Sequence, residues 1–328
     1  MKNLTQRESQ QLIERMMSRG MSHSEMAKTL KDLAEKGETS DEIIGAISAM
    51  RKSMQTIKVP AGSVDTCGTG GDGKHTFNIS TAVALVVAGA GVPVVKHGNR
   101  KASSNCGSAD VLEELGVNIH LTPKQAEEVL ASTGIIFLFA PLYHLAMKYV
   151  APVRKELGIR TIFNFLGPFC NPARLSRQVI GVPNRTMLET LTHVAKALEY
   201  EYMALVTSDD GIDEISPAAI THVRIIKGPD VSSYDIDPKE YDIHHSSLDN
   251  IIGGDGEKNA SIIHSILRGE KGAPRDTVLL NAAMTLVVAG KASSFNQGIE
   301  LAAKSIDSGA AKNTLEALIY SSHNHEHS

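Results

Sequence analysis

A glycine-rich segment with hydroxyl side chains is the part of the sequence with the clearest chemistry. A short apolar run from Val64 leads into GTGGDG (residues 68–73), and Asn78 stands where the N-cap of an apolar helix from Ile79 to Ala90 is expected. Glycines let backbone amides approach an anion, and a helix N-terminus adds unpaired N–H groups and a positive dipole. The segment therefore predicts a phosphate or pyrophosphate site. Its glycines and hydroxyl residues are Gly62, Gly68, Gly70, Gly71, Gly73, Thr69, Thr76, Ser80 and Thr81.

Two common nucleotide motifs do not describe this segment. GxxxxGK[ST] is absent, and GTGGDG lacks the spacing of GxGxxG. A purely structural turn is the alternative interpretation, since glycine marks turns in general. So many glycines and hydroxyls before one helix favour the anion site.

A second loop, residues 96–108, follows a predicted strand and precedes a helix predicted from Ala109 to Leu115. Open α/β sheets bind ligands at the carboxyl ends of their strands, so this loop is a second anion site candidate. A solvated basic loop is the alternative, but two such loops close together in the chain weaken it. The loop's cations and hydroxyls are Lys96, Arg100, Lys101, Ser103, Ser104 and Ser108.

The surrounding pattern predicts an α/β fold: a small N-terminal helical domain plus a large domain with a mostly parallel central sheet flanked by helices. Residues 1–58 show apolar side chains at helical spacing, with Ser24 and Ser40 at expected N-caps. From Val64 onward, short apolar runs alternate with amphipathic helices, which indicates parallel strands joined by helices. The segment from about Asp235 to Gly256 is interpreted as surface loops. Strands are predicted at 92–96, 134–139, 178–182, 202–207 and 222–226, and helices after Asn78, Ser108, Thr122, Asn184 and Asp276.

Charge and composition exclude several classes of protein. The 328 residues carry 33 basic and 37 acidic side chains, so the net charge is −4 and gives no general attraction to nucleic acid or anionic membranes. Three cysteines without a CxxC pair argue against a disulfide framework and fit a reducing compartment. The polar start lacks the apolar core of a signal peptide, and no apolar run is long enough to span a membrane. We expect a cytoplasmic protein.

Several motifs together resemble the anthranilate phosphoribosyltransferase family, whose wider fold is shared with pyrimidine nucleoside phosphorylases. They occur in family order and cover nearly the whole chain, so they are far more specific together than singly. The motifs are DTCGTGGDG (65–73), NIST (78–81), KHGNR (96–100), GSADVLE (107–113), PVRKELG (152–158), FNFLGPFCNP (163–172) and DGIDEIS (210–216).

The resemblance implies a domain division and a dimer. Residues 1–60 would form the small dimerising domain, joined by some helices from about 141–165, and residues 61–328 the large domain. It also implies transfer of the 5-phosphoribosyl group from phosphoribosyl pyrophosphate (PRPP) to the amine of anthranilate in tryptophan biosynthesis, with pyrophosphate released and Mg²⁺ as cofactor. Whether a glutamine amidotransferase (anthranilate synthase) partner takes part is left open.

The resemblance also assigns the site residues. PRPP would be bound by Gly68, Gly71, Asp72, Thr76, Asn78, Ile79, Ser80, Thr81, Lys96, Asn99, Ser103, Ser104 and Ser108. Anthranilate would contact Gly68, Asn99, His144 and Arg154, with Ala140 and Pro141 also flanking its entry. Ser80, Asp213 and Glu214 would bind Mg²⁺, which prefers hard oxygen ligands and shares them with phosphates. No residue is assigned as a nucleophile. His97 and His144 could each be a base or simply a packed histidine.

Three alternatives remain open at this stage: a related phosphoribosyltransferase with another aromatic acceptor, a pyrimidine nucleoside phosphorylase, and a non-enzymatic relative that binds nucleic acid. Some positions depart from the family pattern. Those near the presumed acceptor channel bear on the identity of the acceptor more than on PRPP binding. The departures are Lys101, Ala102, Asn105, Leu145, Tyr149, Cys170 and Thr207.

Overall fold

Three amphipathic helices form the N-terminal part of the molecule. The computed structural model describes residues 1–70, 73–101, 105–244 and 247–324. The first helices are α1 (Gln6–Met17), α2 (His23–Lys36) and α3 (Ser40–Ser53). Each begins with a capping box, in which the N-cap hydroxyl and the N3 glutamate satisfy amides of the first turn. The N-caps of α2 and α3 are Ser22 and Thr39, so the expected caps at Ser24 and Ser40 were wrong by one or two residues.

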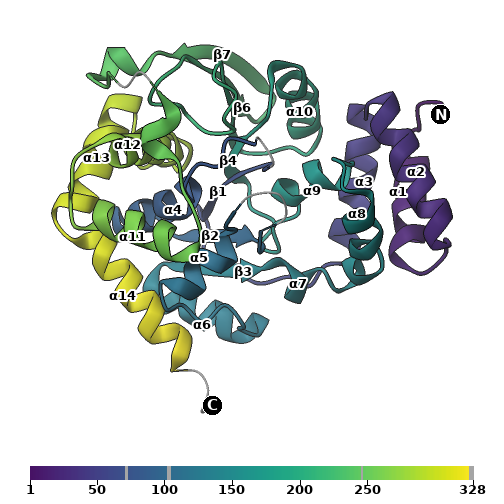
Figure 1. Cartoon of the computed structure of the whole chain (residues 1–328), viewed down its shortest axis with the longest axis horizontal. Helices are drawn as coiled ribbons and strands as arrows, with labels where there is room; N and C mark the ends of the chain where they lie inside the picture. Colours follow the sequence, from purple (N-terminus) through teal and green to yellow (C-terminus); the bar gives the residue numbers. More distant parts are fainter. Residues whose placement is uncertain (71–72, 102–104, 245–246, 325–328) are drawn as a thin grey trace.

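A seven-stranded sheet lies at the centre of the larger domain, in the order β3-β2-β1-β4-β5-β6-β7 (Figure 1). The first five strands in chain order run parallel, whereas β6 and β7 are antiparallel additions at one edge. The mostly parallel sheet predicted from the sequence is therefore confirmed. The strands are β1 (Val64–Gly68), β2 (Val94–Gly98), β3 (Ile135–Phe139), β4 (Arg177–Gly181), β5 (Tyr202–Ser208), β6 (Thr221–Lys227) and β7 (Asp230–Ile236).

Helices cover both faces of the sheet because successive strand residues point to opposite sides. Val179 and Ala204 pack with residues of α12 in one apolar cluster, whereas their chain neighbours Ile180 and Met203 pack with residues of α10 in another. The helices after β1 are α4 (Ile79–Gly89), α5 (Ser108–Glu114), α6 (Pro123–Thr133), α7 (Ala140–Tyr143), α8 (Ala151–Leu157), α9 (Phe163–Phe169), α10 (Arg185–Ala197), α11 (Gly256–Leu267), α12 (Ala273–Val288), α13 (Phe295–Asp307) and α14 (Ala310–His323).

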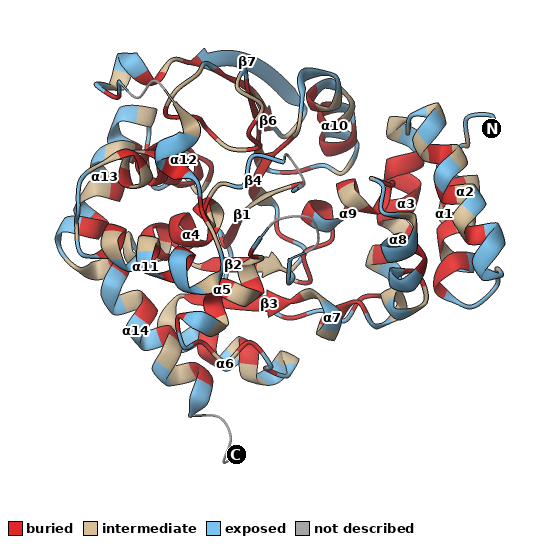
Figure 2. Cartoon of the chain, in the orientation of Figure 1, coloured by how far each residue is buried: buried red, intermediate tan, exposed pale blue. Residues whose placement is uncertain are grey.

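The longest apolar stretch of the sequence is a buried helix. Residues 81–87 of α4 are buried throughout, and α4 lies among α12, α13 and α14 (Figure 2). The apolar helix predicted from Ile79 to Ala90, followed by the strand predicted at 92–96, is thus confirmed. In the described ranges, none of the helices has both the length and the apolarity needed to cross a bilayer.

The segment between β3 and β4 returns to the N-terminal helices. It contains α7, the 3₁₀ turn η1 (Leu145–Tyr149), α8 and α9. α8 packs on α2, η1 on α1 and α9 on α3, and Figure 1 shows α8 beside the N-terminal bundle. The second apolar cluster joins Met50 of α3, Val153 of α8 and Phe169 of α9. The domain limits stated above remain a prediction, but these contacts support counting the segment with the small domain.

Two parts of the fold differ from expectation. The helix predicted after Asp276 begins earlier, at Ala273, with Gly272 at the N-cap position and Asp276 in the first turn. Strand β7 was not predicted, because it lies exposed at the sheet edge and lacks an apolar alternation. Residues 238–241 and 248–251 form the 3₁₀ turns η2 (Pro238–Tyr241) and η3 (Leu248–Ile251), so the surface-loop interpretation holds for much of the segment. The part around Ile251 is an exception, since it is buried against the glycine-rich loop.

Candidate active site

Two cavities adjoin at the carboxyl ends of the strands. The first, about 330 Å³, is called the polar cavity below; the second, about 360 Å³, is called the apolar cavity. His97 and Asn99 line both. The polar cavity is lined by Cys67, Gly68, Thr69, Gly70, His75, Thr76, Phe77, Asn78, Ile79, Ser80, Lys96, His97, Gly98, Asn99, Arg100, Cys106, Gly107, Ser108, Asn164, Asp213 and Glu214. The apolar cavity is lined by Met50, His97, Asn99, Ala140, Pro141, His144, Leu145, Met147, Lys148, Ala151, Arg154, Phe163, Leu166, Gly167 and Cys170.

The glycine-rich loop of the polar cavity is held at both ends by backbone hydrogen bonds. Where β1 ends, the Thr69 N–H donates to the Gly181 carbonyl at 2.9 Å. Farther along, the Phe77 N–H donates to the Ile251 carbonyl at 3.0 Å, and the Gly253 N–H to the His75 carbonyl at 2.9 Å. The segment around residues 251–253 therefore fixes the approach to α4, which the sequence did not reveal.

Asn78 has a different local role from the one predicted. Its side chain does not cap α4. Instead its amide donates to the Cys106 carbonyl at 3.1 Å and accepts from the Asn259 amide at 2.8 Å. Asn78 thus ties the glycine-rich loop to the second loop and to α11.

Lys96 is the cation placed deepest in the polar cavity. Its side chain is only 3% exposed, and its ammonium donates to the Thr66 carbonyl at 2.9 Å and to the Ser80 hydroxyl at 3.0 Å. A buried ammonium attracts an anion strongly because little water screens it. The arrangement suits a phosphate-bearing ligand at the start of α4.

Asp213 and Glu214 enter the same cavity from the loop after β5. The Asp213 carboxylate accepts the Gly70 N–H at 2.7 Å, which links the acidic pair to the glycine-rich loop. A Cβ atom at Gly68 would collide with the Asp213 carboxylate, and one at Gly181 with the Asp213 carbonyl. Glycine is therefore required at the ends of β1 and β4 for the acidic loop to lie across them.

The acidic loop is also held from behind. The Asn281 amide, buried in α12, accepts the Ile215 N–H at 2.8 Å and donates to the Ile215 carbonyl at 2.9 Å. The Asp210 carboxylate accepts hydrogen bonds from the hydroxyls of Ser208 and Ser216. These contacts fix the backbone on both sides of Asp213, so its carboxylate is placed without needing a ligand.

Ser80, Asp213 and Glu214 fit a magnesium ion. All three line the polar cavity and offer the hard oxygen ligands that Mg²⁺ prefers. Among the described residues, no group of three or more histidine, cysteine or acidic side chains forms a metal cage. Mg²⁺ usually keeps waters and shares its remaining positions with substrate phosphates, so three protein oxygens are enough.

The second loop contributes fewer cations than expected. Arg100 lines the polar cavity, but its guanidinium forms ion pairs with Glu113 and Asp110, so its charge is compensated. Lys101 is exposed and does not line the cavity. Ser108 does line it, at the start of α5, where its hydroxyl donates to the Asn99 carbonyl at 3.3 Å.

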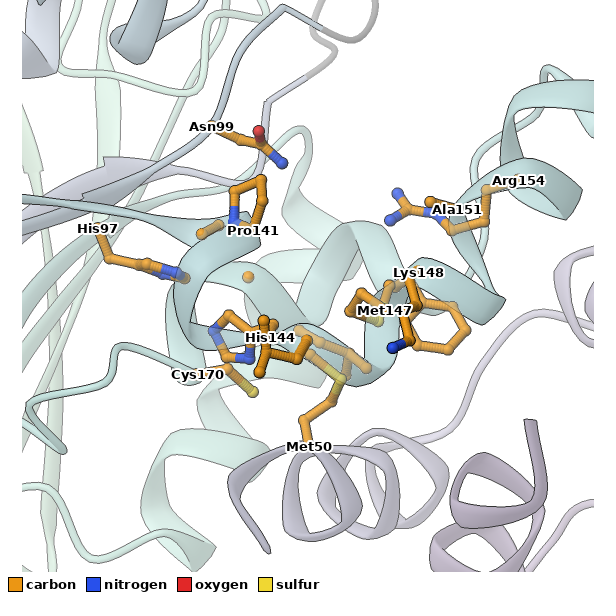
Figure 3. A pocket seen from close by; sticks show the side chains of 15 residues that line it. Met50, His97, Asn99, Pro141, His144, Met147, Lys148, Ala151, Arg154 and Cys170 are labelled. Carbon is orange, nitrogen blue, oxygen red and sulfur yellow. The ribbon is translucent and has the colours of Figure 1, made fainter. Parts of the chain in front are cut away.

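The apolar cavity contains a half-buried cation without an acidic partner among the described residues. No ion pair to Arg154 is formed within the described ranges; its guanidinium donates to the Asn164 side-chain oxygen at a long 3.4 Å and lies 5.5 Å from the centre of the Phe163 ring. Burial lowers the pKa of Arg154. Figure 3 shows its guanidinium directed toward the side of the cavity on which Asn99 and His97 lie. A carboxylate would supply the missing partner.

His97 and His144 are packed against each other and are neutral. Their ring centres lie 5.1 Å apart in the apolar cavity. Burial lowers the pKa of His97 to about 3, with His144 as a further cause, and lowers that of His144 to about 4. Neither ring carries a charge near pH 7, so together they form a polar but uncharged wall.

The structure brings most of the predicted site residues together. Gly68, Thr76, Asn78, Ile79, Ser80, Lys96, Asn99, Ser108, Asp213 and Glu214 line the polar cavity, while Ala140, Pro141, His144 and Arg154 line the apolar one. Thr81 lines neither cavity; it is buried, and its hydroxyl has no hydrogen-bond partner among the described residues. Gly71, Asp72, Ser103 and Ser104 lie outside the described residues.

Some lining residues were missed. Asn164 in the polar cavity belongs to the FNFLGPFCNP motif, and His75 lies between the DTCGTGGDG and NIST motifs, so their positions could have been proposed. Met50 could not, because it lies on α3 of the N-terminal bundle and reaches the apolar cavity only through tertiary packing (Figure 3). Of the departures from the family pattern, Leu145 and Cys170 line this cavity, whereas Tyr149 does not.

Comparisons with known proteins agree with this geometry. The family model "Glycosyl transferase family, a/b domain" matches residues 61–312, and "Glycosyl transferase family, helical bundle domain" matches residues 1–54. An anthranilate phosphoribosyltransferase of Alkaliphilus metalliredigens is 47% identical over 97% of this chain and 94% of its own length. The chain belongs to the anthranilate phosphoribosyltransferase family.

Solved structures of the anthranilate phosphoribosyltransferase family have the same fold. That of Thermus thermophilus superposes with a TM-score of 0.90 at 36% identity, covering 98% of this chain and 96% of that one. That of Saccharomyces cerevisiae, in complex with PRPP and Mg, superposes with a TM-score of 0.89 at 26% identity, covering 98% and 94%. The small helical domain beside a large α/β domain is thus the family's architecture.

Proposed function

We propose that this protein transfers the 5-phosphoribosyl group from PRPP to the amine of anthranilate, releasing pyrophosphate and forming N-(5-phosphoribosyl)anthranilate. The observation that carries the proposal is the pair of adjoining cavities that share His97 and Asn99. One side offers a buried ammonium, glycine-loop amides and carboxylates; the other offers apolar walls and an unpaired guanidinium. These two chemistries match a magnesium-bound pyrophosphate and an aromatic carboxylate respectively. The family membership supports the same pair of substrates.

The donor would occupy the polar cavity. Lys96 and the amides at the start of α4 would hold its phosphate groups, and Ser108 would add a hydroxyl donor at the start of α5. Mg²⁺, held by Ser80, Asp213 and Glu214, would supply positive charge to the pyrophosphate. Pyrophosphate departs as the C1–O bond breaks, so positive groups around it lower the barrier by stabilising the charge that develops.

The acceptor would occupy the apolar cavity. Arg154 would bind its carboxylate, and Pro141, Leu166 and Phe163 would surround its ring. Asn99, at the junction of the cavities, would face the reacting amine. The amine forms the new bond to C1 and then loses a proton to solvent or to the departing pyrophosphate. An aromatic amine is neutral at pH 7, so the protein needs accurate placement more than a base. The low pKa values of His97 and His144 agree, since neither is tuned to accept a proton near neutrality.

We also propose a cytoplasmic homodimer formed through the small helical domain, taken as residues 1–60 with helices from about 141–165. A groove between α1, α3 and η1 supports a helical interface; Met17, Ala49 and Ala146 contribute to it. Light scattering should give twice the mass of one chain, and a single-chain mass would contradict the dimer. Whether a glutamine amidotransferase binds the protein would be tested by co-purification with anthranilate synthase.

The deciding experiment mixes the protein with PRPP, Mg²⁺ and anthranilate and follows the loss of anthranilate fluorescence. Loss that requires all three components establishes the reaction. If fluorescence persists while PRPP still raises the melting temperature in a magnesium-dependent way, the donor is right and the acceptor is another aromatic compound. If PRPP gives no stabilisation, the proposal is wrong. Phosphorolysis of pyrimidine nucleosides and salt-dependent binding of single-stranded DNA then become the next tests.

A further inference from the structure

The central sheet is split beside the polar cavity. Strand β1 pairs with β4 along five residues and β2 pairs with β3 along five, yet β1 and β2 pair only at Val64 and Val94. Beyond that point the two strands run beside each other without a ladder. Main-chain groups that face the gap must find other partners, because buried amides and carbonyls are almost always hydrogen-bonded.

Side chains replace the missing ladder. Along a strand, alternate residues direct their N–H and C=O groups to opposite neighbours. The Val64 N–H donates to the Pro93 carbonyl, so Thr66 also faces the gap, and its carbonyl accepts from the Lys96 ammonium at 2.9 Å. From the other side, the Val95 carbonyl accepts from the Asn171 amide at 2.8 Å, and the His97 N–H donates to the Asp65 carboxylate at 3.4 Å.

Asp65 and Asn171 are joined within the gap. The Asn171 amide donates to the Asp65 carboxylate at 2.9 Å, and its oxygen accepts the Ala173 N–H at 2.9 Å. Both side chains are almost completely buried, at 0% and 3% exposure. Neither lines either cavity, so neither can contact a ligand there. Burying a carboxylate and an amide costs free energy unless both are hydrogen-bonded, so their hydrogen bonds to β1, β2 and each other account for their presence in the sheet.

We propose that Asp65 and Asn171 are positioning residues: they form a wedge that keeps β1 and β2 apart beyond Val64 and Val94, and the gap leaves the Thr66 carbonyl free to hold the Lys96 ammonium at the polar cavity. This inference rests on the proposed function, since it assigns Lys96 to the phosphates of the donor. In a closed β1–β2 ladder a main-chain amide would occupy the Thr66 carbonyl. The gap leaves this carbonyl free to accept from the Lys96 ammonium, which also donates to the Ser80 hydroxyl. The FNFLGPFCNP motif then does more than line the apolar cavity, because Asn171 also belongs to it.

The first test is hydrogen exchange of the peptide covering residues 94–98, followed by mass spectrometry and without any ligand. Asn171→Ala removes a partner of Val95 and of Asp65, so exchange should accelerate by about tenfold or more in this peptide. Ser305→Ala is the matched control: it also removes one buried hydrogen bond, from Ser305 to the Val86 carbonyl at 2.7 Å, but near the end of α4 rather than at its start beside Lys96. Unchanged exchange in Asn171→Ala would overturn the wedge.

The second test is calorimetric binding of magnesium pyrophosphate. Asn171→Ala should raise the dissociation constant about tenfold or more, while the KM for anthranilate stays within about twofold and Ser305→Ala changes neither. A purely structural role would weaken the binding of pyrophosphate and of anthranilate equally. That result would overturn the claim that the wedge positions Lys96. If the native protein does not bind magnesium pyrophosphate but the exchange result is as expected, the wedge stands and the proposed donor is wrong.

A second pair of variants approaches the wedge from β1, so the conclusion does not depend on one variant folding. Asp65→Asn keeps an oxygen acceptor for Asn171 and the His97 amide, whereas Asp65→Ala removes it. We expect Asp65→Asn to resemble the native protein in exchange and in pyrophosphate binding, and Asp65→Ala to resemble Asn171→Ala. Equal loss of pyrophosphate binding in Asp65→Asn and Asp65→Ala would show that the charge of Asp65, not the spacing of β1 and β2, positions the Lys96 side chain. That result would overturn the proposal.

Discussion

Truncation of Arg154 should separate binding of the acceptor from stability of the fold. Its guanidinium lines the apolar cavity and forms no ion pair with any described residue. Removing one partner of a buried charge pair costs about 2–5 kcal/mol. Arg154 remains half-buried, so we take about 3 kcal/mol, which is roughly a hundredfold loss in kcat/KM for anthranilate. Arg154→Lys should recover only part of this loss, because an ammonium cannot form the two parallel hydrogen bonds of a guanidinium.

The ligand-free protein should not be destabilised by Arg154→Ala, because the change removes a desolvated charge that has no acidic partner. Arg275 provides the matched control. Its side chain is buried, it donates to both Asp307 carboxylate oxygens at 2.7 and 2.9 Å, and it lies away from both cavities. Arg275→Ala should lower the melting temperature and leave KM for anthranilate unchanged. Initial rates at varied anthranilate and PRPP, with thermal melts, provide the measurements. The reasoning fails if Arg154→Ala lowers kcat/KM for anthranilate by less than about tenfold, or lowers kcat/KM for PRPP by the same factor.

Three further predictions concern the metal ligands, the glycines beneath them and the histidines. Asp213→Asn should raise the Mg²⁺ concentration for half-maximal rate by about tenfold or more, because an amide is a weaker ligand than a carboxylate; a magnesium titration decides this, and an unchanged midpoint refutes it. Gly68→Ala should shift that midpoint in the same direction, since its Cβ would displace the Asp213 carboxylate, whereas Gly167→Ala, with open space around it, should not. His97 and His144 have folded pKa values of about 3 and about 4 against 6.5 ordinarily, so the unfolded chain binds more protons below pH 6.5 and stability should fall as pH drops from about 6.5 toward 4. His144→Asn should reduce the slope of this decline in stability by up to about 1.4 kcal/mol per pH unit. Thermal melts across this pH range measure the slope, and the same slope in the native protein and in His144→Asn would contradict the prediction.

Local patterns allowed much of the fold and of the donor side to be predicted. The glycine-rich loop and α4 were identifiable because glycines, hydroxyls and an apolar helix follow each other directly in the chain. The helix predicted after Thr122 was also correct: Thr122 is its N-cap, and the hydrogen bonds of that cap involve residues only three apart. Helix starts shifted where several serines and threonines competed for one cap, as at Ser22 and Ser24.

Features that depend on distant residues could not be predicted. Strand β7 pairs with β6 at an exposed edge, and its side chains are too polar to show a strand period. The backing of the glycine-rich loop by Ile251 joins residues far apart in the chain through main-chain groups, which leave no mark on side-chain types. The same holds for Met50 and for the gap that Asp65 and Asn171 keep open: each residue type is ordinary, and only the tertiary arrangement gives it a purpose.

The two cavities differ in how they are built, and the difference bears on which substrate can change. Strand ends, the start of α4 and the clamped acidic loop form the polar cavity, and a change there would disturb the central sheet. Short helices between residues 140 and 170, together with α3, form most of the apolar cavity, and they pack on the small bundle rather than within the sheet. Leu145 and Cys170, two of the departures from the family pattern, lie in this second cavity. Acceptor preference can therefore shift through such substitutions while PRPP and Mg²⁺ stay in place, and His97 and Asn99 hold the junction at which the two substrates must meet.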